Sequence, residues 1–241
     1  MKHLFLALTN PVPGREADYN AWYDKVHLRE IVDYSHGMLG ARRFKLSDDQ
    51  RPGQEPAPWG YVAAYDMEVD DVAAYFAKPL KDDAPTLEPF TGIIAEDFTG
   101  WLYTPIGPRY SRPGVASQRL PGEGFLFFAL TNAAEGREDD FNAWYDDYHL
   151  REVVERIPCF MAGQRYRLAD EQHSRWPRSP WKYLAIYEVQ AESAAAIHAA
   201  AAGALKGAQP AGGSLDPHHI AWVFESIGPY YGAQPATTAQ S

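Results

Sequence analysis

Two hydrophobic periods alternate along the chain and predict its elements. Residues 3–9 form a short apolar run that ends at the turn-forming pair Asn10-Pro11, which is typical of a buried strand. Residues 16–34 instead place apolar and aromatic side chains at three- and four-residue steps, which predicts a helix. The residues that set this helical period are Tyr19, Trp22, Tyr23, Val26, Ile31 and Tyr34.

The rest of the first half continues this alternation. Residues 39–46 and 59–67 have strand character, and a Pro-, Gly- and Asp-rich connection separates them. Residues 69–77 predict a second, weaker helix, and residues 98–104 a fourth strand. The resulting order β-α-β-β-α-β is that of the split βαβ, or ferredoxin-like, unit.

The second half repeats the first at the level of individual residues. Residues 4–50 align with 126–172 at a constant offset of 122, and 24 of these 47 positions are identical. The helix segment Asn20-Ala-Trp-Tyr-Asp24 recurs as Asn142-Ala-Trp-Tyr-Asp146. A repeat near 120 residues is too long for a solenoid, so each copy should be a complete small domain. Residues 191–206 predict a helix and residues 220–226 the last strand.

The repeat predicts how the two copies are arranged. A βαββαβ unit covers one sheet face with its helices and needs a second layer on the other face. We therefore expect an α+β fold of two tandem ferredoxin-like βαββαβ repeats packed sheet to sheet as a pseudo-dimer within one chain. Residues 1–110 and 124–231 would be the repeats, residues 111–123 a linker and residues 232–241 a disordered tail.

Composition and charge exclude several classes of protein. Apolar residues make up 46% of the chain, but no run reaches the roughly 18 residues of a membrane span. The net charge of −10 and the lack of a basic cluster argue against nucleic-acid binding. Cys159 is alone, so neither an intrachain disulfide nor a cysteine-rich metal site can form. The apolar run at the start is too short for a secretion signal, and we expect a cytoplasmic protein.

The predicted first helix of each copy carries a recognisable motif. The segments Tyr19–Glu30 and Phe141–Glu152 resemble the EthD-like branch of the dimeric α/β-barrel superfamily. The second copy continues the pattern in Ile157-Pro-Cys-Phe160, whereas the first departs from it at Tyr34-Ser-His-Gly37. The resemblance implies an intrachain dimeric α/β-barrel. Relatives include cofactor-free cyclases, isomerases and lyases of polyketide or aromatic catabolism, as well as haem enzymes.

One polar stripe on each predicted helix suggests chemistry. Helical spacing places Asn20, Tyr23, His27, Glu30 and Ile31 on one side, and the second copy repeats this stripe. Histidine is the usual general acid or base near neutral pH, so His27 and His149 are the candidate catalytic residues. Tyr23 and Tyr145 can donate hydrogen bonds to an oxygen that gains charge. The alternative is that each histidine only locks its helix onto the sheet.

The neighbouring polar and aromatic positions are assigned supporting roles. Asp24 and Asp146 can orient the histidines, or they can pair with cations on the solvent side. The i, i+3 spacing of His27 and Glu30 suits a metal pair, but no further ligands cluster nearby, so we expect no metal. His36 is a candidate gate or an exposed turn residue. Asn20 and Asn142 can bind substrate or brace the loop after the first strand. Four aromatic side chains can bind substrate or fill the core: Trp22, Trp144, Tyr61 and Tyr183.

These features lead to a functional hypothesis. We expect a cofactor-independent acid/base enzyme of the lyase, dehydratase, cyclase or isomerase type. Its substrate would be a hydrophobic aromatic or polycyclic small molecule, as in aromatic-compound catabolism. The alternatives are a non-catalytic binding protein for such a molecule, a haem-binding member of the same superfamily, and a scaffold with filled pockets. We also expect that the chain can pair further as a homodimer.

Overall fold

A computed structural model describes residues 1–87, 92–115 and 124–232. Each half of the chain contributes four strands to a shared sheet and helices to its outer side. The elements of the first half are β1 (Lys2–Thr9), α1 (Glu16–Trp22), η1 (Tyr23–His27), α2 (Leu28–Tyr34), β2 (Met38–Leu46), β3 (Tyr61–Glu68), α3 (Val72–Ala77) and β4 (Thr99–Ser111). Those of the second half are β5 (Phe125–Thr131), α4 (Glu138–Trp144), η2 (Tyr145–His149), α5 (Leu150–Arg156), β6 (Phe160–Leu168), β7 (Tyr183–Val189), α6 (Ala194–Ala201) and β8 (Ile220–Gly232).

The eight strands close into one antiparallel barrel in the order β1-β3-β2-β8-β5-β7-β6-β4. The strands of each half stay together, and β2 pairs with β8 while β4 pairs with β6 to join the halves. The contact between the halves is therefore edge-to-edge hydrogen bonding as well as packing of the inner faces. This closure leaves no free strand edge in the barrel. An α+β fold built around a barrel is thus confirmed.

Alternation along each strand separates the barrel interior from its outer surface. On β1, Leu4, Leu6 and Leu8 point inward and join a core that continues through Trp222 in the second half. Phe5 and Ala7 point outward and pack beneath the helices of the first half. The period of two in the sequence therefore serves two hydrophobic layers, one inside the barrel and one outside it.

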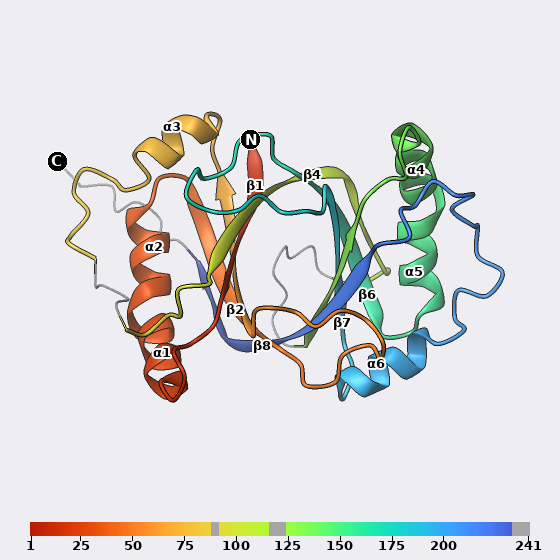
Figure 1. Ribbon diagram of the computed structural model, residues 1–241, viewed down its shortest axis with the longest axis horizontal. Coiled ribbons are helices and arrows are strands. Elements are labelled where there is room, and N and C mark those ends of the chain that lie inside the picture. The colour runs from red at the N-terminus through yellow and green to blue at the C-terminus, as the bar shows by residue number, and fades with distance from the viewer. Residues whose placement is uncertain (88–91, 116–123, 233–241) are drawn as a thin grey trace.

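The helices lie on opposite sides of the barrel (Figure 1). Helices α1 and α2 flank one side, and α4 and α5 flank the other. Each helical layer has its own apolar core against the outer barrel face. Short helices begin where polar side chains cap them: the Asp71 carboxylate accepts a hydrogen bond from the Ala74 amide at 2.8 Å, and Ser193 caps α6 similarly.

Several predicted boundaries differ from the observed ones. The last strand of each half is longer than predicted, because its C-terminal part pairs with the other half of the chain. Strand β4 continues through Ser111 and β8 through Gly232, so these residues belong to strands and not to a linker or tail. The predicted linker from 116 onward and the predicted tail from 233 onward lie outside the described residues. Helices α3 and α6 are shorter than the predicted 69–77 and 191–206.

No helix in the described part of the chain is both long enough and apolar enough to cross a membrane.

Candidate functional site

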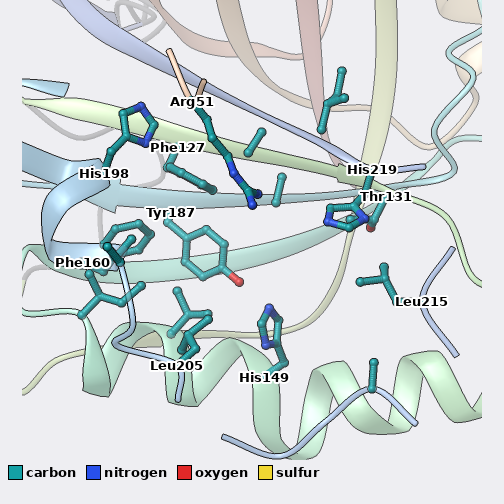
Figure 2. A pocket seen from close by; sticks show the side chains of 18 of the residues that line it. Arg51, Phe127, Thr131, His149, Phe160, Tyr187, His198, Leu205, Leu215 and His219 are labelled. Atoms are coloured by element: carbon teal, nitrogen blue, oxygen red, sulfur yellow. The ribbon is translucent and has the colours of Figure 1, made fainter. Parts of the chain in front are cut away.

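Each half of the molecule holds a cavity between its helical layer and the outer face of the barrel. The first cavity has a volume of about 580 Å³ and the second about 680 Å³. Both volumes fall in the range of small-molecule sites. His27 lies in the wall of the first cavity and His149 in the wall of the second, and Figure 2 shows His149 pointing inward from its helix.

A turn of π-helix places each histidine. The predicted helix over residues 16–34 is continuous, but its middle turn, Tyr23–His27, has the wider π geometry. The second half repeats this feature at Tyr145–His149. Such turns are rare and are frequent at functional sites. The sequence carries no signal for this change of period, which alters the side-chain stripe that straight helical spacing predicts.

The π turn brings a tryptophan onto the face of each histidine. The rings of Trp22 and His27 stack with centroids 4.3 Å apart, and Trp144 and His149 do the same. Tyr23 meets the His27 ring edge-on at 5.1 Å. All three side chains line the first cavity. Trp22 and Tyr23 therefore fix the plane of the imidazole at the cavity wall, and Trp144 and Tyr145 do so in the second half.

Both histidines are neutral at physiological pH. Burial, with a smaller contribution from the nearby Arg43 guanidinium, lowers the pKa of His27 to about 4. Burial and Arg165 lower the pKa of His149 to about 4 in the same way. A neutral imidazole can accept a proton from a bound molecule, so each cavity presents a base in its unprotonated form.

A buried arginine packs against the tyrosine of each site. The guanidinium of Arg43, only 1% exposed, donates to Asp24 Oδ1 at 2.7 Å and to Asn20 Oδ1 at 2.6 Å. It also lies over the Tyr23 ring, 4.5 Å from the centroid. Asp24 and Asn20 thus bind Arg43: Asp24 pairs with a cation, one of its two predicted alternatives, and Asn20 does not line the first cavity.

The second half builds the same support. Arg165 donates to Asp146 Oδ1 at 2.5 Å and to Asn142 Oδ1 at 2.7 Å, and it lies 4.5 Å from the Tyr145 ring centroid. Neither these two acceptors nor their counterparts line the cavities. The occurrence of arginine at the same position of both copies is the signal in the sequence that points to Arg43 and Arg165.

The tyrosines on the third strand of each half have two different roles. The Tyr61 hydroxyl donates to Glu16, the first residue of α1, and the Tyr183 hydroxyl donates to Glu138, the first residue of α4. Neither tyrosine lines a cavity, contrary to their predicted role in substrate binding. Tyr65 and Tyr187, four residues further on, line the cavities instead. Figure 2 shows the Tyr187 hydroxyl directed toward His149.

The first cavity contains two buried hydroxyls without a hydrogen-bond partner. The Tyr65 hydroxyl and Thr99 Oγ1 are inaccessible to solvent, and neither finds a partner among the described residues. Buried polar groups are nearly always paired, so such groups in a cavity wall indicate a partner supplied by a ligand. Burial also raises the pKa of Tyr65 well above its usual value, so its hydroxyl remains a donor.

Metal binding has no support within the described ranges. No group of three or more His, Cys, Asp or Glu side chains is placed there to hold a metal ion. Glu152 pairs with Arg156 at 2.9 Å and so does not form a metal pair with His149. His36 is exposed at the turn after α2 and does not line the first cavity.

Comparison with solved structures identifies the fold. The chain superposes on an anthrone oxidase-like protein with a TM-score of 0.56 and 10% identity, covering 100% of this chain and 96% of that one. It also matches a candidate monooxygenase from Fusobacterium nucleatum, with a TM-score of 0.56 and 8% identity over 96% and 94% of the two chains. A candidate monooxygenase from Lactobacillus acidophilus matches with a TM-score of 0.51 and 8% identity over 96% of each chain.

These similarities show that the chain shares its overall fold, an α+β barrel, with these proteins. No family model matches the sequence, and no curated protein matches it.

Proposed function

We propose that the protein is a cofactor-independent enzyme that removes a proton from a hydrophobic aromatic small molecule. His27 and His149 are the bases, each in its own cavity. The overall reaction is of the lyase, dehydratase, cyclase or isomerase type. The observation that carries the proposal is the placement of a neutral, desolvated imidazole in the wall of an aromatic cavity.

The first cavity supplies the groups that such a step needs. A ketone with acidic C–H bonds would lie flat among Phe5, Trp22 and Tyr65, with the C–H bond toward His27. As the proton leaves, negative charge develops on the ketone oxygen, and the buried Tyr65 hydroxyl can donate a hydrogen bond to it. That charge also stabilises the protonated imidazole, which the empty cavity disfavours. General-base catalysis of this kind contributes about 10²–10⁴-fold.

The chain architecture is consistent with two sites of common origin. We propose that residues 1–110 and 124–231 are tandem ferredoxin-like repeats, each with one cavity, and that the helix motif reflects an EthD-like origin. The repetition of the π turn, the stacked tryptophan and the buried arginine supports this proposal. We also propose that the protein acts in the cytoplasm and can pair as a homodimer.

A second candidate function is oxygenation of the same deprotonated intermediate. Two of the structural neighbours are described as monooxygenases and another as anthrone oxidase-like, which favours a reaction with dioxygen. The balanced step converts a CH₂ group and O₂ into a carbonyl and water. The proton abstraction at His27 or His149 is common to both candidates, so one experiment can test it independently of the later step.

The test uses anthrone, a tricyclic aromatic ketone, as the probe. Purified protein and anthrone are incubated without oxygen in D₂O, and NMR follows deuterium incorporation at the methylene carbon. We expect exchange faster than in buffer alone, with roughly half lost in His27→Gln or His149→Gln and nearly all in the double variant. His36→Gln, which changes an exposed histidine, should leave the rate unchanged.

Two results would contradict the proposal. Exchange that survives in the double variant would show that the histidines are not the bases. Thermal stabilisation by anthrone without exchange above the buffer rate would indicate a binding protein. The same samples, once opened to air, separate the two enzymatic candidates, because only oxygenation consumes dissolved oxygen.

A further inference from the structure

Each cavity is closed by a loop from the opposite half of the chain. The loop between β2 and β3 crosses the barrel end and reaches the second cavity, where Arg51 and Pro52 form part of the lining. The loop between β6 and β7 reaches the first cavity, where His173, Arg175 and Trp176 form part of the lining. Neither site is complete without the other half.

A glutamine fixes each crossing loop to the strand it meets. Gln50 Nε2 donates to the Val223 carbonyl at 2.8 Å, and the Val223 amide donates to Gln50 Oε1 at 2.9 Å. Gln172 makes the equivalent pair of bonds with the backbone of Leu102, at 2.7 and 2.9 Å. The side-chain amide of each glutamine therefore makes the two backbone hydrogen bonds that a neighbouring strand would make. The residue that follows each glutamine lies in the opposite cavity: Arg51 in the second and His173 in the first.

Arg51 presents a free positive charge to the second cavity. It makes no hydrogen bond or ion pair with any residue of the described ranges. Figure 2 shows its side chain extending inward, above the hydroxyl of Tyr187. Arg51 is exposed and in this differs from the buried Arg43 and Arg165, which are both held by carboxylates.

The rest of this lining adds no negative charge. The lining includes three histidines, His149, His198 and His219, and contains no aspartate or glutamate. His198 also contacts the Asp49 carbonyl at 3.2 Å, which secures the same loop against α6. The protein carries a net charge of −10, so the absence of acidic side chains from this lining, shared with the lining of the first cavity, is a local feature of the two cavities.

We infer that the second cavity binds an aromatic molecule that carries a carboxylate, with Arg51 as its counter-charge. The aromatic part lies between Phe127, Trp144 and Tyr187, and the carboxylate faces the loop from the first half. A guanidinium can bind a carboxylate through two parallel hydrogen bonds, which gives both affinity and orientation. This inference rests on the proposed function and names the substrate class of one of its two sites.

The first cavity gives the expected contrast. At the position that corresponds to Arg51 it has His173, whose ring packs against Trp176 with centroids 4.3 Å apart and against Phe76 at 5.3 Å. An aromatic cluster therefore occupies the place of the free guanidinium. Arg175, which also lines the first cavity, lies two residues further along its loop, so the two crossing loops deliver their guanidinium groups at different positions.

The test compares two probes that differ only in charge. Naphthalene-2-carboxylate and naphthalene-2-carboxamide are titrated calorimetrically into the full chain at pH 8, where the acid is ionised. We expect the carboxylate to bind about tenfold more tightly than the amide at its stronger site. Arg51→Met should remove this preference and leave the affinity for the amide unchanged. Lys25→Met, which removes an exposed cation outside both cavity linings, should behave as the unmodified protein.

The preference should also weaken between 50 and 500 mM salt, since screening acts on the carboxylate alone. Equal affinity for the two probes, or a preference that persists in Arg51→Met, would overturn the inference while leaving an aromatic cavity in place. Failure of both probes to bind would overturn the inference and also the aromatic cavity on which the proposed function rests.

Discussion

Replacing Tyr65 by phenylalanine removes a buried hydroxyl that has no partner among the described residues. The side chain is 2% exposed and its hydroxyl faces the first cavity. A buried hydroxyl that makes no hydrogen bond costs about 1–3 kcal/mol of folding free energy relative to a satisfied one. We therefore expect Tyr65→Phe to leave the free energy of unfolding unchanged or to raise it by about 1 kcal/mol. Catalysis at the first site should fall, because the donor to the developing oxygen charge is lost.

Tyr61→Phe is the matched control on the same strand and the same face. The Tyr61 ring is equally buried, but its hydroxyl donates to the Glu16 carboxylate. Hydrogen bonds to charged groups contribute about 1.5–3 kcal/mol. Lys45 Nζ, at 3.0 Å, still pairs with Glu16 after the change, so we expect a loss near the lower end, about 1–2 kcal/mol.

The free energies of unfolding of the two variants should therefore differ by about 1–3 kcal/mol, with Tyr61→Phe the less stable. Urea unfolding at pH 7, followed by fluorescence and circular dichroism, gives both free energies with an unchanged m-value. In thermal unfolding, 1 kcal/mol corresponds to about 2–4 °C for a chain of this size. If Tyr65→Phe destabilised the protein as much as Tyr61→Phe, the Tyr65 hydroxyl would have a structural partner. Its assignment as a donor reserved for a ligand would then be wrong.

Three further predictions concern the supporting residues. Arg43→Met should lower the free energy of unfolding by about 1–3 kcal/mol, because it removes the hydrogen bonds of a buried guanidinium to Asn20 and to the half-exposed Asp24 carboxylate. Arg165→Met should do the same, as chemical denaturation can check. Because the pKa values of His27 and His149 are about 4 in the folded protein, each neutral histidine contributes roughly 3 kcal/mol to the free energy of unfolding above pH 6.5, and this contribution is lost as the pH falls from 6.5 to 4. The double variant His27→Gln, His149→Gln should show a weaker pH dependence when unfolding is measured across this range. Gln50→Ala should release the crossing loop, seen as faster amide exchange at Val223, and should weaken carboxylate binding at the second cavity severalfold.

Period and repetition made the element order predictable from the sequence. Alternation on β1 and the three- and four-residue steps around Trp22 distinguish strand from helix because each element buries one face. The boundaries of the last strands were not predictable. The extensions of β4 and β8 pair with β6 and β2, and those hydrogen bonds depend on how the two halves meet.

The candidate site was predictable only along the helix itself. His27, Tyr23 and Trp22 were named because their residue types and spacing suggested a pocket wall, and all three line the first cavity. Asn20 was assigned to the site because it lies on the polar stripe, and Asp24 because it lies three residues before His27. In the structure they bind Arg43, which comes from a different strand. Spacing along the sequence predicts which side chains are neighbours on the same helix. It gives no information about a partner such as Arg43, which lies on another element.

Duplication within one chain explains why the crossing loops matter for function. In a symmetric dimer of identical subunits, any change in the loop that closes the partner's cavity alters both sites at once. Fusion of the two copies removes this constraint, because the residue after Gln50 and the residue after Gln172 can change separately. One of them is arginine and the other histidine, while the base, the stacked tryptophan and the buried arginine are the same in both halves. The chemistry is therefore kept in common, and selectivity is free to diverge at the two loops.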